Sequence, residues 1–456
     1  MSKIVNKDDL TDGEIAKIYK YCKASKTKTP FLQFPKPIKL FGYDGKRFWV
    51  PMAMDLHGMT YNDYYGIPDK KAKYEFSGKL YEGYDDPKGE NRNQVKVLTE
   101  ALEDLASQGT AFLHVSTGYG KSVILTALLH SLGLKAAVIV FSQQLQTDIL
   151  KTMKTLTTAK ICHFKSTKEP PLDTDIDVMG LKKASSPKLT SKFFSRYSVI
   201  IFDEVDQLPS EKSIPLLQKI APRYLIGLTA TVERSDGLHS VLYKYWGNKK
   251  YFITRFVKKS NATIIKYQTN FVPEIEYESD GTVNNVTLTN SLAYNEKRHA
   301  SIEKLIRSLY PQKQLWLSDR EDEIVAIYNR IKDLDADYKT GVKKDMDKNK
   351  KILIGGHKSC GRGYDVPGLE VVGMLTSFRN VKQYEGRLRS ESGTIYDFVD
   401  CAPILEARWK TRLTWYRKRD FNIKFQIDGM DDVRDYNPPR GSRPPKNTKY
   451  KEISIL

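Results

Sequence analysis

The chain has 456 residues, enough for about three domains of roughly 150 residues each. Its charged fraction of 28% and hydrophobic fraction of 40% are those of an ordinary globular protein, which excludes a collagen-like repeat and wholesale disorder. Since 74 Lys and Arg residues face 55 Asp and Glu residues, the formal net charge is +19. A field of that sign predicts a polyanionic partner, either nucleic acid or an anionic membrane.

No stretch approaches the roughly 18 apolar residues that a membrane span needs. The polar start MSKIVNKDDL also lacks the apolar core of a signal peptide. We therefore expect a cytoplasmic protein without a membrane partner. Its four cysteines are too widely spaced for a zinc ribbon or a redox pair and are expected to be reduced thiols: Cys22, Cys162, Cys360 and Cys401.

Residues 1–88 are rich in Tyr, Phe, Pro and Lys. The turn signal Asp44-Gly45 lies between the short apolar runs 40–43 and 48–50, which favours a small, strand-rich accessory domain. Its aromatic side chains either form a core or stack on bases, and the core hypothesis is favoured because large aromatic residues are usually buried.

In residues 89–247, apolar runs such as AAVIVFS and YSVIIFDEV alternate with helical segments. This pattern predicts a parallel sheet covered by helices on both faces. The pattern returns in residues 248–428, which end in a basic helix, and residues 429–456 read as a basic, flexible tail. The predicted fold class is therefore α/β, with two tandem sheets and a small N-terminal domain. The basic stretch 408–424 is expected to contribute more to nucleic-acid binding than the tail.

A phosphate-binding loop is predicted where the apolar strand TAFLHV passes through Ser116-Thr117-Gly118-Tyr119-Gly120-Lys121-Ser122 into a helix. Glycines let backbone N–H groups wrap phosphates, and the helix N-terminus adds positive potential. Lys121 would reach the β- and γ-phosphates of ATP, and the Ser122 hydroxyl would ligate Mg²⁺. Val115 stands where the common pattern has its first glycine. The alternative is a Gly-Lys-Ser turn without a ligand.

A second acidic site is predicted at the end of the buried run VIIFD. Asp203 would hold Mg²⁺ through water, and Glu204 would act as general base toward the attacking water. The alternative is an acidic cluster that merely caps a helix. Together the two motifs predict hydrolysis of a nucleoside triphosphate.

With these motifs the chain resembles the superfamily 2 helicases and translocases, which have two RecA-like domains. STGYGKS looks like motif I, DEVD at Asp203–Asp206 like motif II and GLTATVER at Gly227–Arg234 like motif III. GRGYDVPG at Gly361–Gly368 looks like motif V and QYEGRLRS at Gln383–Ser390 like motif VI. Within the superfamily, the chain resembles UvsW-like phage branch-migration helicases, XPB-type translocases and poxviral transcript-release helicases.

The resemblance implies further nucleotide contacts. Gln94 stands near the place of an adenine-reading glutamine, with a surface-loop residue as the alternative. Motif V implies contacts by Gly363 and Asp365, and motif VI implies one by Gln383. Arg387 keeps the place of the arginine that neutralises γ-phosphate charge. Arg389 is a second candidate for this role. In the family motif two residues separate the two arginines, whereas here only Leu388 separates Arg387 from Arg389.

The resemblance also implies a nucleic-acid track made by polar loops that follow buried strands. Such groups would grip phosphate and sugar rather than read sequence, and each could instead be a solvated loop residue. The matching residues are Ser142, Gln143, Lys182, Lys183, Ser318, His357, Lys358 and Ser359.

The leading hypothesis is a monomeric, ATP- and Mg²⁺-dependent DNA helicase or translocase that acts on single-stranded and branched DNA in replication, recombination or repair. A phage or viral source would place it in the host cytoplasm. The alternatives are an RNA helicase or transcript-release factor, and a non-catalytic nucleic-acid-binding scaffold.

Overall fold

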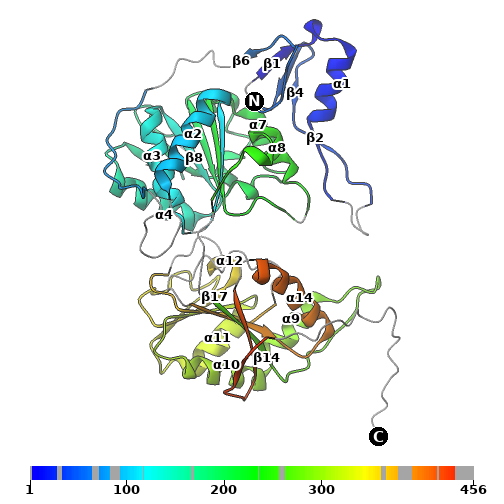
Figure 1. Ribbon diagram of the computed structural model, residues 1–456, viewed down its shortest axis with the longest axis vertical. Coiled ribbons are helices and arrows are strands. Elements are labelled where there is room, and N and C mark those ends of the chain that lie inside the picture. Colours follow the sequence, from blue (N-terminus) through cyan, green and yellow to red (C-terminus); the bar gives the residue numbers. More distant parts are fainter. Residues whose placement is uncertain are drawn as a thin grey trace. The chain divides into compact units, whose positions relative to one another are not determined.

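The computed structural model describes residues 3–27, 33–63, 71–82, 93–116, 118–165, 169–234, 236–255, 262–360, 366–377, 393–418 and 421–436. These residues form two compact units, one that extends up to residue 255 and one that begins at residue 262. Each unit contains a sheet with helices packed on it (Figure 1). Within the described ranges, no helix is both long and apolar enough to cross a lipid bilayer.

The first sheet has seven strands in the order β13-β7-β12-β11-β8-β10-β9, and all neighbouring pairs are parallel. Its strands are apolar along their length because helices cover both faces. All five residues of β8, for example, are buried. The strands are β7 (Thr110–Val115), β8 (Ala136–Val140), β9 (Ile161–His163), β10 (Ile176–Gly180), β11 (Val199–Asp203), β12 (Tyr224–Thr229) and β13 (Ile253–Arg255).

Alternate residues of these strands enter two hydrophobic clusters on opposite faces of the sheet. In β11, Ile201 packs with residues of α2, α3 and α4, whereas Ile200 and Phe202 pack with residues of α6, α7 and α8. The helices are α2 (Gln94–Gln108), α3 (Lys121–Leu132), α4 (Gln143–Leu156), α5 (Leu181–Ala184), α6 (Ser191–Phe194), α7 (Ile214–Lys219) and α8 (Ser240–Trp246). The predicted α/β pattern is confirmed in this unit.

The N-terminal segment is strand-rich, as predicted, and forms a sheet in the order β4-β5-β1-β6. Gly45, with φ of +95°, provides the turn between β4 and β5, and the Asp44 carboxylate accepts hydrogen bonds from the backbone N–H groups of Lys46 and Arg47. The elements are β1 (Lys3–Asn6), α1 (Asp12–Tyr21), β2 (Lys23–Ala24), β3 (Ile38–Lys39), β4 (Gly42–Tyr43), β5 (Arg47–Val50) and β6 (Asn62–Asp63). We call residues 3–63 the N-terminal module.

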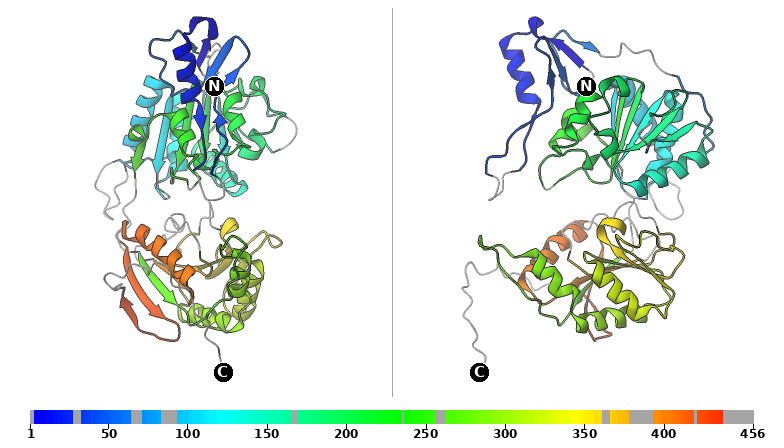
Figure 2. Two further views of the ribbon diagram at one scale, coloured as in Figure 1. Left: turned by 90° about the vertical axis from the view of Figure 1, so that its right-hand side faces the viewer. Right: turned by 180° about the vertical axis from the view of Figure 1, so that it is seen from behind.

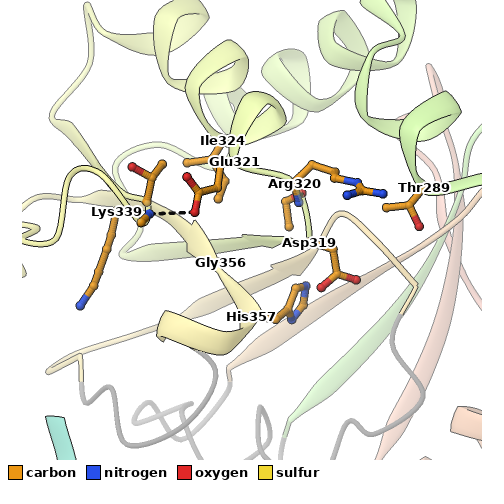
Figure 3. Close-up of a pocket in the computed structure, with 11 residues that line it drawn as sticks. Thr289, Asp319, Arg320, Glu321, Ile324, Lys339, Gly356 and His357 are labelled. Atoms are coloured by element: carbon orange, nitrogen blue, oxygen red, sulfur yellow. Dashed lines mark hydrogen bonds between the residues drawn. The ribbon is translucent and has the colours of Figure 1, made fainter. Parts of the chain in front are cut away.

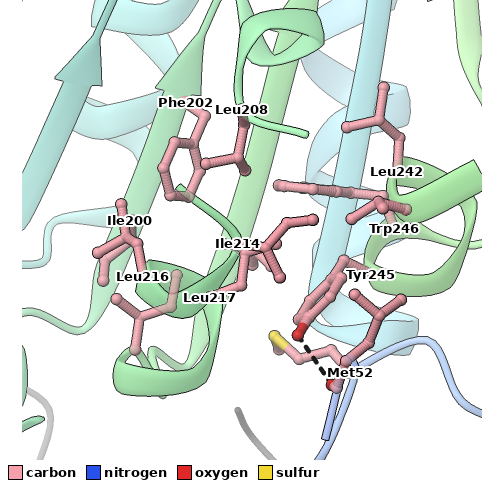
Figure 4. Close-up of a cluster of buried hydrophobic side chains, with 14 of the residues drawn as sticks. Met52, Ile200, Phe202, Leu208, Ile214, Leu216, Leu217, Leu242, Tyr245 and Trp246 are labelled. Carbon is pink, nitrogen blue, oxygen red and sulfur yellow. Dashed lines mark hydrogen bonds between the residues drawn. The ribbon is translucent and has the colours of Figure 1, made fainter. Parts of the chain in front are cut away.

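The N-terminal module shares one hydrophobic cluster with the first α/β domain. Met52 lies beside Tyr245, whose hydroxyl donates a hydrogen bond to the Leu40 carbonyl at 3.1 Å (Figure 4). In both views of Figure 2, the dark-blue module lies against the green helices of the first unit. Phe41 and Phe48 are buried in this cluster, so the core hypothesis is confirmed for these two rings.

The second sheet has eight strands in the order β16-β17-β15-β18-β19-β14-β20-β21, and only β21 runs antiparallel to its neighbour. Its strands are β14 (Thr263–Gln268), β15 (Gln314–Ser318), β16 (Ala336–Lys339), β17 (Ile352–Gly356), β18 (Val371–Met374), β19 (Thr394–Val399), β20 (Asn422–Ile427) and β21 (Val433–Asp435). The helices are α9 (Asn285–Ala293), α10 (Glu296–Ser308), α11 (Glu321–Ile331), α12 (His357–Cys360) and α14 (Pro403–Lys418). This unit has the second predicted α/β pattern.

The predicted basic C-terminal helix is α14, on which Lys410 and Arg417 are exposed but one arginine is not. Arg412 is buried, and its guanidinium donates two hydrogen bonds of 2.7 Å to the Asp397 carboxylate in β19. The Tyr416 hydroxyl donates to the same carboxylate at 3.0 Å. Part of the stretch 408–424 therefore packs into the core of the second unit, and we expect deletion of the stretch to destabilise this unit as well as to remove any phosphate contacts.

The Arg412–Asp397 pair predicts a large stability effect. Asp397→Asn leaves the Arg412 charge buried without its counter-charge, so the free energy of unfolding should fall by about 3–5 kcal/mol. Urea denaturation of the full chain measures this loss. The matched control is Asp432→Asn, whose Arg434 partner lies 2.5 Å away with both side chains largely exposed. An equal effect of both substitutions would contradict the structural role of the buried pair.

Candidate functional site

The predicted phosphate loop lies between the end of β7 and the first residue of α3, Lys121. Gly118 and Gly120 have φ of +80° and +90°, a left-handed conformation that glycine adopts without steric cost. A Cβ on Gly120 would also lie 2.2 Å from the Gln94 Nε2 atom. The glycine loop thus leads directly into a helix N-terminus, which is the arrangement that binds phosphate.

The loop lysine contacts the acidic end of β11. Lys121 Nζ lies 3.2 Å from Glu204 Oε1, and both side chains are mostly buried. Burial lowers the pKa of Lys121, but the nearby carboxylates of Glu204 and Asp203 outweigh it and hold the pKa above its ordinary value. Burial raises the pKa of Asp203 to about 6, against the opposing effect of Lys121. The two sequence motifs, about 80 residues apart, therefore form one site.

The donor set at this site fits a divalent cation. Ser122 is the second residue of α3, and its hydroxyl and the Asp203 carboxylate are the hard oxygen ligands that such ions prefer. The raised pKa of Asp203 means that added positive charge would stabilise the ionised carboxylate. A helix N-terminus on one side and carboxylates on the other suit a metal ion with bound phosphates.

Gln94 is the first residue of α2 and is buried, so the surface-loop alternative is wrong. Its Nε2 donates to the Tyr119 carbonyl at 2.8 Å, and its Oε1 accepts from the Tyr81 N–H at 3.1 Å. The Tyr119 hydroxyl in turn accepts from the Asn93 N–H at 3.1 Å. Gln94 thus holds the phosphate loop here, and one N–H and one oxygen lone pair of its amide are already used in these bonds.

The acidic motif is also tied to the loop after β12. Thr229 Oγ1 donates to Asp206 Oδ1 at 2.7 Å, and both residues are buried. Arg234 donates from Nη1 to the Asp206 carbonyl and from Nε and Nη2 to the Asp236 carboxylate, at 2.9 and 2.6 Å. The sequence interpretation placed Arg234 in a motif but gave Asp236 no role. Their Arg-x-Asp spacing was the available signal.

In the first unit, the predicted nucleic-acid contacts lie at one edge of the sheet. Ser142 and Gln143 follow β8, Lys182 and Lys183 follow β10, and these parallel strands are neighbours. Ser142 caps α4 by accepting from the Leu145 N–H at 3.2 Å. Gln143 and Lys182 are exposed, and Lys183 Nζ lies 4.5 Å from the centroid of the Phe164 ring.

In the second unit, Ser318 and His357 line a polar cavity of about 470 Å³. Ser318 is fully buried, and its hydroxyl donates to Glu323 Oε2. That carboxylate also binds the buried Arg298 guanidinium at 2.6 Å. Ser318 therefore organises the cavity wall, and its side chain is not available to a nucleic acid in this structure.

His357 lies at the start of α12 and faces the cavity (Figure 3). Burial holds its pKa well below the ordinary value, so the ring is neutral near pH 7 and supplies no positive charge. Asp319, Arg320 and Lys339 line the same cavity, and sequence reasoning missed them. Asp319 and Arg320 directly follow β15, and Lys339 is the last residue of β16. These positions at strand ends could have identified them from the sequence.

Several predicted site residues have no described side-chain position. Lys358 and Ser359 lie in α12, but only their backbone is described. The others lie outside the described residues: Thr117, Gly363, Asp365, Gln383, Arg387 and Arg389.

Comparison with known families gives a match of residues 88–234 to the family described as "Type III restriction enzyme, res subunit". This match covers the phosphate loop, the acidic motif and the segment up to Arg234. It contains the residues that form the contact between Lys121 and Glu204.

The most similar curated relatives include viral proteins that match most of the chain. Protein 161L of Invertebrate iridescent virus 6, named as a candidate helicase, is 27% identical over 74% of this chain and 83% of its own. Protein L396 of Acanthamoeba polyphaga mimivirus, named as a candidate ATP-dependent RNA helicase, is 24% identical over 92% of this chain and 85% of its own.

Among solved structures, S. cerevisiae Dbp5 bound to RNA and ADP BeF3 matches with a TM-score of 0.51. The match has 12% sequence identity and covers 73% of this chain and 90% of that protein. At this identity the match shows a shared fold, which is the predicted RecA-like architecture. The two α/β sheets and the viral relatives named as helicases together show that this chain is similar to the superfamily 2 helicases, as its sequence motifs indicate.

Proposed function

We propose that this chain is a nucleic-acid-stimulated ATPase that moves on DNA and unwinds or remodels it, preferentially forked or branched DNA during replication, recombination or repair. The observation that carries the proposal is the 3.2 Å contact between Lys121 on the phosphate loop and Glu204 after β11. It joins the proposed phosphate-binding cation and the proposed general base, and both side chains are mostly buried.

ATP binding would change this contact. The phosphates of ATP would compete with Glu204 for the Lys121 ammonium, so nucleotide would release the carboxylate from its ion pair. The freed Glu204 could then accept a proton from the attacking water. In this proposal, ATP binding frees the general base that its hydrolysis needs.

The remaining groups would stabilise charge. Mg²⁺, held by Ser122 and through water by Asp203, would supply positive charge to the phosphates. Arg387, with Arg389 as second candidate, would add charge at the γ-phosphate, an effect of about 10³–10⁵ in rate in GTPases. Gly363, Asp365 and Gln383 are proposed to contact nucleotide, and the Gly120 N–H group is proposed to bind phosphate. The Tyr119 N–H is proposed to join it after leaving the Ser116 carbonyl, to which it donates at 3.3 Å.

DNA would be gripped by the polar sheet-edge residues of each unit. In the first unit these are Gln143, Lys182 and Lys183, which lie at the ends of neighbouring strands. In the second unit, Arg320 and Lys339 carry the positive charge that His357 lacks. Such contacts to phosphate would carry little sequence information.

RNA is the alternative substrate, and a specific observation favours it. The mimiviral relative is named as an ATP-dependent RNA helicase, and the yeast structure was solved with RNA. The proposed phosphate contacts do not separate the two nucleic acids, because both expose the same phosphate groups.

The deciding experiment measures ATP hydrolysis by the full chain with single-stranded DNA, forks, Holliday junctions and RNA duplexes. We expect the largest stimulation and strand separation with forks and junctions. Stronger stimulation by RNA would replace the DNA proposal with the alternative. Binding without hydrolysis on every substrate would instead support a non-catalytic scaffold.

Salt dependence tests the phosphate contacts directly. Binding to single-stranded DNA should weaken with a log–log slope of about −0.7 per neutralised phosphate, so Lys182→Ala should make the slope shallower by about that amount. Fluorescence anisotropy between low and moderate salt measures it. Lys188→Ala, at an exposed lysine beyond α5, is the matched control. If Lys182→Ala leaves the slope unchanged, Lys182 does not contact phosphate.

A further inference from the structure

Glu204 has an unusual backbone conformation. Among the described residues it is the non-glycine residue with a positive φ, at +53°. Side-chain-bearing residues adopt this left-handed region at an energetic cost and persist in it only where neighbouring contacts hold them. Its backbone N–H donates to Asp203 Oδ1 at 3.0 Å, and the 3-10 turn η2 (Val205–Gln207) follows at once.

The contacts that hold this turn converge on Asp206, at its centre. Its carboxylate accepts from the Thr229 hydroxyl at 2.7 Å, and its carbonyl accepts from Arg234. The Arg234 guanidinium is itself fixed by a two-pronged pair with Asp236, which forms one hydrogen bond to each carboxylate oxygen. Arg234 and Asp236 therefore act on the turn that carries Glu204, although neither contacts Glu204.

The same loop is held from the other side by the N-terminal module. The Thr27 N–H donates to the Asp236 carbonyl at 2.8 Å. Gly237, with φ of +75°, comes so close that a Cβ there would lie 2.3 Å from Thr27 Oγ1. Thr27 follows β2, which pairs with β3 inside the module. An unbroken series of contacts thus runs from the module to the turn at Glu204.

We propose that Arg234 and Asp236 are positioning residues for the proposed general base, and that the N-terminal module holds them through Thr27. This inference rests on the proposed ATPase function for its consequence in turnover. The claim that these contacts hold the turn 204–207 in place does not depend on that function. The module is then a component of the ATPase site rather than an independent attachment.

The first experiment compares Arg234→Ala and Asp236→Asn with Glu169→Gln, which removes a 2.5 Å ion pair to Arg196 elsewhere in the same unit. The two loop substitutions should lower the kcat for ATP by at least about tenfold, as expected for a misplaced general base, and leave KM within twofold. Arg234→Lys keeps the positive charge but loses the two-pronged contact with Asp236, so its kcat should lie between those of Arg234→Ala and the parent chain. A merely structural role would lower thermal stability in all variants without this split between kcat and KM.

The second experiment isolates the module. Thr27→Pro removes the N–H that binds the Asp236 carbonyl, whereas Thr27→Ala keeps it. Hydrogen exchange of the amides of residues 205–207 should be at least threefold faster in Thr27→Pro and in Asp236→Asn than in Thr27→Ala or the parent chain. This measurement needs no turnover, so it separates the inference from the ATPase proposal. Equal exchange in the two Thr27 variants would refute the role of the module, and unchanged exchange in Asp236→Asn would refute the positioning role.

Discussion

Lys121→Ala should reduce ATP turnover by at least about 10²-fold, the loss typical for removal of one charge-stabilising group from a preorganised site. The loss of turnover should be larger than after removal of a surface cation, for two reasons. The ammonium would contact the phosphates directly. It also lowers the pKa of the neighbouring Asp203 carboxyl, so without it that carboxyl would ionise less readily and bind a metal ion less well.

Steady-state ATPase assays and equilibrium ATP binding measure this effect. Nucleic-acid affinity should stay within about twofold, because the charge lies among the carboxylates and not at the sheet-edge residues. The matched control is Lys160→Ala, which removes a largely exposed lysine paired with Asp173 at 3.3 Å and should leave turnover unchanged. Hydrolysis by Lys121→Ala at the parent rate would show that the phosphate-loop assignment is wrong.

Glu204→Gln should separate ATP binding from hydrolysis. The amide keeps the size of the side chain but cannot accept the proton of the attacking water, so kcat should fall by about 10²–10⁴-fold. ATP affinity should stay equal or increase. In the parent chain the phosphates must displace Glu204 from Lys121, and a neutral glutamine competes less for the ammonium.

Single-turnover hydrolysis and fluorescent-nucleotide binding distinguish these effects. Glu103→Gln, at an exposed position on α2, provides the matched control and should behave as the parent chain. Full activity of Glu204→Gln would remove Glu204 from the reaction. Weaker ATP binding would contradict the competition between Glu204 and phosphate for Lys121.

The local sequence was sufficient for much of the fold because local pattern and tertiary environment agree there. A strand buried on both faces must be apolar throughout, so β8 and β11 could be recognised without their neighbours. Gly118 and Gly120 signal a loop that only glycine can form easily. For buried strands and glycine loops, the residue types in a short segment are enough to predict its conformation.

The environments of polar side chains were much less predictable. Ser318 was predicted as a phosphate contact, but it is buried against Glu323. Arg412 lies in a stretch expected to contribute to nucleic-acid binding, yet it pairs with Asp397 in the core. In the same way, Arg298 is buried between Glu323 and Asp400, which lies 102 positions away. A charged residue gives the same local signal whether it meets solvent or a distant partner, since only the folded chain supplies the counter-charge.

The sequence by itself determined the two α/β patterns, the strand-rich start and the positions of the glycine loop and the acidic strand end, because each depends on residues that are adjacent in the chain. Only the tertiary structure decided that Lys121 meets Glu204, that the Gln94 amide braces Tyr119, and that Thr27 meets the loop at Asp236. These contacts join segments from 25 to more than 200 positions apart. The Lys121–Glu204 contact forms because parallel strands end at one edge of the sheet. The contact of Thr27 with Asp236 forms where the module and the first domain share one hydrophobic cluster.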